Sequence, residues 1–177
     1  LTSMNTVKEK EIGTIEQINV TPIKRYQFIA GKLFPFWIIA MFELAFGLIL
    51  GKIIYDIPIV GDLKIVFLFA SIYLPAVLGI GLFISTITQT QQQAMMFSMF
   101  LTFIFILMSG LFTPVESMPE WAQYFNVINP VAYFIQVMRM VLLKGSGLIE
   151  LKTQFISIAI YSFLILGLSV WRYRKTA

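Results

Sequence analysis

The sequence predicts an all-α integral membrane protein, and three observations support this fold class. Of the 177 residues, 58% are hydrophobic and 12% are charged, whereas soluble domains carry about 25% charged residues. The charged residues also avoid long stretches of the chain, as they do in membrane spans. Four apolar runs are each long enough to cross a hydrocarbon core, which takes about 20 helical residues. We therefore expect one transmembrane domain over residues 1–177, with spans at about 30–52, 65–87, 94–112 and 153–172.

The segment before the first span is polar and contains two helix-start signals. Thr14 and Gln17 have the spacing of a capping box, which predicts a short helix from Ile15 to about Asn19. Thr21-Pro22 is a second start signal, and the helix that follows it is expected to continue into the first span. From the residues alone, the short helix is either a docking element for a cytoplasmic partner or an interfacial anchor that precedes a span.

Glu43 lies near the middle of the first span. An intramembrane carboxyl group is costly and normally faces protein or a water-filled path. Its role is therefore either a contact with a substrate or proton, or hydrogen bonding between packed helices. Gly47 and Gly51 form a small-xxx-small pattern on the same span, which favours close approach of another helix. The many Met and Phe side chains of the third span face lipid and other helices or line a surface for an apolar substrate. The candidate substrate path consists of Glu43, Phe46, Met99 and Phe103.

The stretch "GLFTPVESMPEWAQYFNVINPV" interrupts the apolar pattern between the third and fourth spans. Gly110 and Pro114 are expected to end the third span. Ser117 and Glu120 have capping-box spacing, which predicts a helix from Met118 to about Phe125. A second start signal, Asn129-Pro130, predicts another helix that ends near Leu143.

This second helix has about 14 residues and is about 21 Å long, which is shorter than the hydrocarbon core. It also contains Gln136 and Arg139, and a span here would place the basic tail "RYRK" outside. We therefore predict a re-entrant hairpin over residues 115–145 that enters from the outer face, in preference to a fifth span or a loop lying on the surface. The hairpin is expected to act as an outer lid. Its candidate gate residues are Pro114, Pro119, Trp121, Asn129, Pro130 and Arg139.

The charged residues indicate sidedness and exclude several functions. There is no Cys and no His, which removes thiol nucleophiles, disulfides, Cys/His zinc sites and histidine bases. No catalytic motif is present, so an intramembrane enzyme is disfavoured and no metal site is expected. The net charge of +4 reflects the enrichment of Lys and Arg on the cytoplasmic side and not nucleic-acid binding. The bias places both ends of this chain in the cytoplasm.

Two segments resemble one family. The stretch "EKEIGTIEQINVTPIKRYQFIAGKLFPF" resembles the cytoplasmic loop and span entry of ABC-2 type exporter permeases. The stretch "GLFTPVESMPEWAQYFNVINPVAYFIQVMRMVLLKG" is similar to the extracytoplasmic segment that precedes the last span in that family, with the drug-exporter branch the closer likeness. With the spans between and after them, the likeness covers nearly the whole chain.

The resemblance implies that the chain is the C-terminal part of a six-span permease in the inner membrane of a prokaryote, in contact with lipid and with a second permease subunit. Residues 5–21 would form the coupling region, which docks on a cytoplasmic ABC ATPase subunit. ATP and Mg would be bound by that partner, and this chain would bind no cofactor. The cargo would be drug-like, lipid or polysaccharide. The alternative is a membrane scaffold without a transport path. The expected coupling residues are Glu9, Glu11, Gly13, Thr14, Ile15, Glu16 and Ile18.

Overall fold

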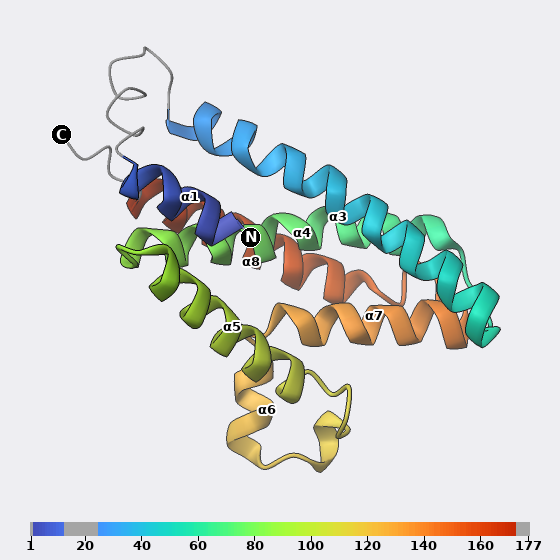
Figure 1. Ribbon diagram of the computed structural model, residues 1–177. Coiled ribbons are helices and arrows are strands. Elements are labelled where there is room, and N and C mark those ends of the chain that lie inside the picture. The colour runs from blue at the N-terminus through green and yellow to red at the C-terminus, as the bar shows by residue number, and fades with distance from the viewer. Residues whose placement is uncertain (1, 13–24, 173–177) are drawn as a thin grey trace.

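The computed structural model describes residues 2–12 and 25–172, and every regular element in this part of the chain is a helix (Figure 1). The elements are α1 (Thr2–Glu11), α3 (Arg25–Tyr55), α4 (Leu63–Ile87), α5 (Gln91–Met108), the 3-10 helix η1 (Val115–Ser117), α6 (Glu120–Asn126), α7 (Pro130–Lys144) and α8 (Lys152–Arg172). Four of them, α3, α4, α5 and α8, are long and apolar enough to cross a membrane. The predicted all-α integral membrane fold is therefore confirmed. The short helix expected at residues 15–19 lies outside the described residues.

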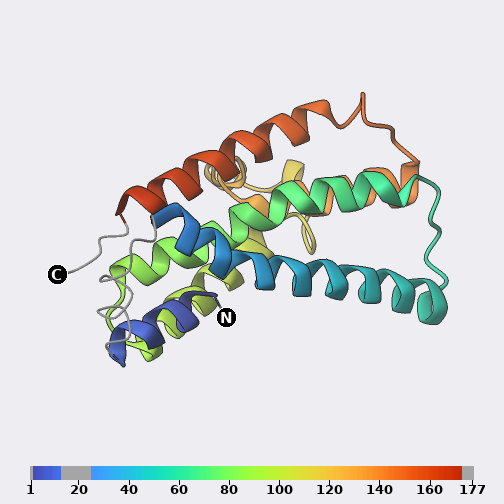
Figure 2. The same cartoon turned by 90° about the horizontal axis from the view of Figure 1, so that it is seen from above.

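The central helix is α4, which packs along α8 and also contacts α1, α3, α5 and α7 (Figures 1 and 2). The main buried core forms where α4 meets α7 and α8, around Phe69, Val137 and Ile158. The Phe69 ring packs edge-on against Phe155, with 5.1 Å between the ring centroids. Interlocked aromatic and branched side chains stabilise a membrane bundle through close packing, because lipid tails are as apolar as the side chains themselves.

At its other end α4 approaches α8 closely at a glycine. A Cβ atom on Gly79 would lie 3.0 Å from Ile165 Cγ2. The Ser169 hydroxyl of α8 lies 2.9 Å from the Gly79 carbonyl oxygen, to which it donates a hydrogen bond. Small residues of this kind let two backbones come together inside a membrane. The two helices are thus fastened at both ends of their shared length.

The ends of α4 and α5 carry side-chain caps. The Asp62 carboxylate accepts a hydrogen bond of 2.9 Å from the Lys64 backbone N–H at the start of α4. Thr90 caps α5 by accepting from the Gln93 N–H. The turn between these two helices occupies only residues 88–90, so α4 and α5 are held as consecutive neighbours. Such caps satisfy backbone donors that have no partner within the helix.

Helix α1 is an element that the local sequence signals did not predict, since they placed the first short helix from Ile15 to about Asn19. Its Thr2, Ser3, Thr6 and Val7 side chains are buried, and the helix packs against α4 and α5. The Thr6 hydroxyl donates to the Thr2 carbonyl oxygen at 3.0 Å, so a polar side chain is buried with its donor satisfied. The predicted coupling region at residues 5–21 therefore begins within this buried helix.

We predict that Gly61→Ala destabilises the fold by about 1–3 kcal/mol, because an added methyl group overpacks a contact between two backbones. The Val60 N–H donates to the Leu142 carbonyl oxygen at 3.0 Å, and a Cβ atom on Gly61 would lie 2.5 Å from the Val141 carbonyl oxygen. The measurement is the thermal unfolding midpoint in detergent. Gly147→Ala is the matched control, because a Cβ atom there meets nothing within 4 Å. Equal midpoints for the two variants would contradict this prediction.

Candidate functional site

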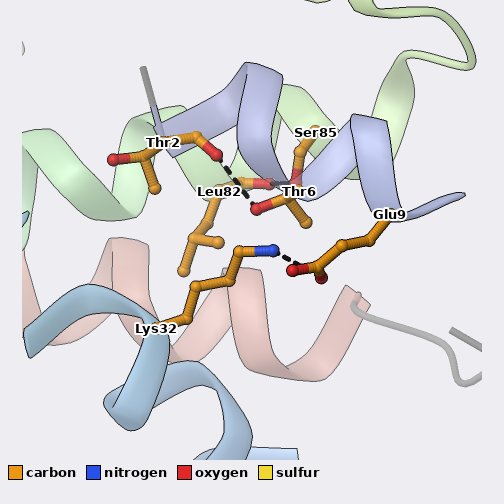
Figure 3. A network of polar contacts seen from close by, with 6 residues as sticks. All are labelled: Thr2, Thr6, Glu9, Lys32, Leu82 and Ser85. Atoms are coloured by element: carbon orange, nitrogen blue, oxygen red, sulfur yellow. Dashed lines mark hydrogen bonds and ion pairs between the residues drawn. The ribbon is translucent and has the colours of Figure 1, made fainter. Parts of the chain in front are cut away.

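An ion pair joins α1 to α3 at the end of the bundle where α1 and the start of α3 meet the end of α4 (Figure 3). Lys32 Nζ lies 2.6 Å from Glu9 Oε2, with 9% of the lysine side chain exposed and 30% of the glutamate side chain. The ammonium group also lies 5.6 Å from the centroid of the Phe28 ring. A largely buried lysine needs such a counter-charge, because desolvation disfavours the charged form. The pair therefore fixes the distance between α1 and the first turns of α3.

A second acidic residue joins α1 to α5. The Glu11 carboxylate accepts a hydrogen bond of 2.8 Å from the Gln91 backbone N–H, and the Gln91 side-chain amide donates to the same carboxylate. The side-chain hydrogen bond from Gln91 is the larger cause, and the backbone hydrogen bond the smaller, of a lowered pKa of the Glu11 carboxyl group. A carboxylate at the first residue of a helix also interacts favourably with the helix dipole. Elsewhere on the interface between α1 and α5, the hydroxyl oxygens of Ser3 and Ser98 are 2.8 Å apart.

Two of the predicted coupling residues, Glu9 and Glu11, are therefore placed by the structure in contacts within the chain. The other five, Gly13, Thr14, Ile15, Glu16 and Ile18, lie outside the described residues. Docking of this region on a partner stays a prediction. The finding that sequence reasoning missed is that residues 13–24 connect two helices that are already tied together by Glu9 and Lys32.

In the region of the predicted hairpin, α6 and α7 meet at a bend of 84°, and Asn129 is buried at this bend. Its side-chain oxygen accepts from the Val131 N–H and caps α7. Its side-chain amide donates to the Phe105 carbonyl oxygen of α5 at 2.8 Å and to Asn126 Oδ1 at 3.2 Å. The Phe105 carbonyl lies in the last turn of α5, where carbonyl groups lack partners within the helix. One side chain thus starts α7 and attaches the hairpin to α5.

The predicted start at Asn129-Pro130 is confirmed, and α7 ends at Lys144 with Gly145 as its C-cap, whose φ of +68° suits glycine. The predicted capping box of Ser117 and Glu120 is wrong. Ser117 belongs to η1, and α6 begins at Glu120 with Pro119 at its N-cap and no side-chain cap. The reason is local: the residue before a proline is driven to extended backbone, which holds Ser117 out of the α6 turn.

Helix α7 runs from the last turn of α5 to the loop between α3 and α4, and it packs along α4 on the way. The bent pair α6–α7 has the geometry of a re-entrant hairpin or of a broken span. Its entry from the outer face, like the cytoplasmic location of the chain ends, stays a prediction.

A cavity of about 610 Å³ opens between the end of α5, η1, α6 and α7. Its polar lining includes Glu116, Gln123, Gln136 and Arg139. Arg139 Nη2 donates to the Gly110 carbonyl oxygen at 3.0 Å and to that of Leu111 at 3.3 Å. These contacts tie α7 to the chain that leaves α5.

The six predicted gate residues all lie in or beside the hairpin region, but in different settings. Pro114 and Pro119 precede η1 and α6, and Asn129 and Pro130 are buried at the bend. Arg139 lines the cavity, whereas the Trp121 side chain is exposed. The structure thus gathers five of them around α6, α7 and the end of α5, with Trp121 directed outward. Their function as a gate stays a prediction.

The four residues of the predicted substrate path are not brought together within the described chain. Glu43 and Phe46 lie on α3, and Met99 and Phe103 lie on α5. Both helices pack on α4, and they make little or no contact with each other. All four side chains are exposed. A shared path through them therefore requires surfaces beyond those that one copy of residues 2–12 and 25–172 supplies. Within these residues, no three acidic side chains gather as metal ligands.

The model of one protein family, described as "ABC-2 family transporter protein", matches residues 1–171. Among curated proteins, the chain is 36% identical over 148 residues to the "Probable multidrug ABC transporter permease YbhR" of Escherichia coli strain K12, which covers 84% of this chain and 40% of that protein. It is 29% identical over 170 residues to the "Probable multidrug ABC transporter permease YbhS" of the same strain, which covers 96% of this chain and 45% of that protein.

A third relative is the "Inner membrane transport permease YhhJ" of Escherichia coli strain K12, with 26% identity over 177 residues, 99% of this chain and 47% of that protein. The chain thus spans less than half the length of these relatives. No solved structure matches the chain.

We predict that Glu9→Gln destabilises the fold by about 1.5–3 kcal/mol, the usual range for a hydrogen bond to a charged group. The change leaves the Lys32 ammonium group buried without its counter-charge. The measurement is the thermal unfolding midpoint in detergent, with Glu150→Gln as the control, because Glu150 is exposed and has no ion pair among the described residues.

A charge swap, Glu9→Lys with Lys32→Glu, should recover part of the loss. Strictly additive losses from the two single changes would contradict a direct interaction.

We predict that Trp121→Cys reacts with a membrane-impermeant thiol reagent in intact cells, and that Ala122→Cys does not. The two neighbours lie on the same short helix, with Trp121 68% exposed and Ala122 3% exposed. The chain has no native cysteine, so each variant gives one signal. Labelling of Trp121→Cys only after the cells are permeabilised would contradict the predicted sidedness. Asn129, although near the tip of the same hairpin, is fully buried and is unsuited to this test.

Proposed function

The chain belongs to the ABC-2 family of transporter proteins, and we propose that it is the C-terminal part of the permease of an ATP-driven exporter. The observation that carries this proposal is the family match over residues 1–171, together with four helices long enough to span a membrane. We further propose that ATP and Mg are bound and ATP is hydrolysed by a separate cytoplasmic ABC ATPase. The permease would work beside a second permease subunit in the inner membrane of a prokaryote, in line with the printed name of YhhJ.

The cargo proposed for this exporter is a hydrophobic or amphipathic compound. Two of the relatives are named probable multidrug permeases, which supports this class. The large share of exposed apolar side chains on α3 and α5 is suited to lipid and to apolar compounds alike.

The proposed coupling follows from the contacts of α1. If the ATPase moves the segment of residues 13–24, the displacement first reaches the end of α1 and the start of α3, which flank it in the sequence. The Glu9–Lys32 pair links these two helices, and the Glu11–Gln91 bonds link α1 to α5. Movement of the segment would therefore be shared by two spans at once, through hydrogen bonds that are strong because each involves at least one charged group.

The proposal is tested by cargo flux. The full-length permease and its ATPase are reconstituted in vesicles, and ATP-dependent movement of a fluorescent amphipathic compound across the membrane is measured. The control is an ATPase subunit whose phosphate-binding lysine is changed to alanine. Flux that requires ATP and an active partner supports the exporter. A complex that assembles and hydrolyses ATP, but moves none of a panel of amphipathic compounds, would favour the scaffold alternative.

We predict that a photoreactive crosslinker on Ile15→Cys or Glu16→Cys captures the ATPase subunit in the functional complex. The reason is that these residues lie in the segment proposed to dock on the partner. Trp121→Cys, which we place at the opposite end of the spans, is the control and should capture none. The measurement is a shifted band on a gel, identified by mass spectrometry. Absence of the crosslink in a complex that still transports would contradict the docking assignment.

A further inference from the structure

A groove runs along one face of α3 at Glu43, Gly47 and Gly51. Residues spaced by four lie above one another on a helix, so the two glycines form its floor and the carboxyl group stands at one end. The groove has a volume of about 320 Å³. Every lining residue other than Glu43 is apolar or glycine. The walls are made by Leu44 and Leu48 of α3, Ile57 and Ile59 of the α3–α4 loop, and Met138 and Leu142 of α7.

The two glycines, expected to pack against another helix, form the floor of this groove. A Cβ atom on Gly47 would meet nothing within 4 Å, and one on Gly51 would lie 3.1 Å from Ile57 Cδ1. The loop thus covers the Gly51 end and leaves the Gly47 position open. The groove of about 320 Å³ over the open Gly47 position is large enough for a small molecule.

The Glu43 carboxyl group lies midway along an apolar span that covers Tyr26–Tyr55. It has no hydrogen-bond or ion-pair partner among the residues that the structure describes. One basic residue on α3 and one on α7 are already engaged elsewhere. Lys52 of the same helix is paired with Asp56 at 3.2 Å, and Arg139 of α7 donates to the carbonyl groups of Gly110 and Leu111. A carboxylate at this depth is costly without a counter-charge, so an occupant that brings a positive charge is favoured over a neutral one.

We propose that this groove binds a lipophilic monocation, with the cationic centre at Glu43 and the apolar body over Gly47. Met138 and Leu142 of α7 cover the apolar body from the side, and methionine adapts readily to differently shaped ligands. An apolar cavity with one placed polar group is the usual form of a small-molecule site, and about 300 Å³ is the lower end of the usual size range. This assignment names a substrate class and rests on the proposed export function.

The test measures binding of radiolabelled tetraphenylphosphonium to the purified full-length permease in discs of neutral lipid, by equilibrium dialysis without ATP. Triphenylphosphine oxide is the neutral probe of similar shape. We expect the cation to bind at least tenfold more weakly to Glu43→Gln than to the unchanged protein. Binding of the neutral probe should be the same for both proteins. Gly47→Leu, which fills the groove, should abolish cation binding. Gly31→Leu on the same helix, where a Cβ atom also meets nothing within 4 Å, should leave it unchanged.

Equal cation binding to the unchanged protein, Glu43→Gln and Gly47→Leu would overturn the site. A Gly47→Leu variant that changes the oligomeric state on size exclusion would also overturn it, because the groove would then hold a neighbouring subunit. The flux experiment separates this inference from the proposed function. ATP-dependent flux with unaltered binding in the variants rejects only the site. Cation binding that follows the expected order, without any flux, keeps the site and rejects the exporter.

Discussion

Every backbone polar group of this chain that lies in hydrocarbon has to find a partner within the protein, because lipid offers none. The long helices meet this requirement along their length but not at their ends. The critical place is therefore the break between α5 and α7, where Asn129 supplies the Phe105 carbonyl group with a donor and the first turn of α7 with an acceptor. Without such a residue, a chain break beside a span would leave unpaired groups at several kcal/mol each. The hairpin, the cavity behind it and the position of α7 all depend on this solution.

The same constraint explains how hydroxyl side chains are accommodated within the spans. Ser71, Ser85 and Thr86 of α4 each donate to a carbonyl group three or four residues earlier in the same helix, as does Thr102 of α5. Each of these hydroxyl donors is thus satisfied within its own helix. Other polar contacts cross between helices, and they include those of Ser169, Glu9 and Glu11. They mark where one helix is fastened to another.

The spans could be predicted from the sequence because span formation depends on length and apolarity, which are local properties. The start of α7 was equally local, since Asn129-Pro130 acts within two residues. Helix α1 was missed because its stability comes from tertiary contacts with Ser98, Lys32 and Gln91, which no local pattern reveals. The capping box at Ser117 failed because Pro119 imposes a stronger local restriction. The pairing of Gly47 and Gly51 with a groove, and the separation of Glu43 from Met99, depend on which helices are neighbours, and spacing along one helix carries no such information. Lys32, a charged residue at the start of an apolar run, is the sequence feature that could have indicated a contact with an acidic residue such as Glu9.

Helix α7 is attached at both of its ends. Asn129 holds its first residue to α5, and its last turn is held by Val60, whose N–H reaches the Leu142 carbonyl oxygen, and by the tight backbone contact at Gly61. Because both ends of α7 are attached, the helix is not free to pivot about one end, and a displacement at one end is passed along its axis to the other. A shift of the end of α5 would be delivered through α7 to the loop that follows α3. Helix α7 thus acts as a strut between the end of α5 and the loop that follows α3, so a relative displacement of these two spans would have to strain or break one of its two attachments.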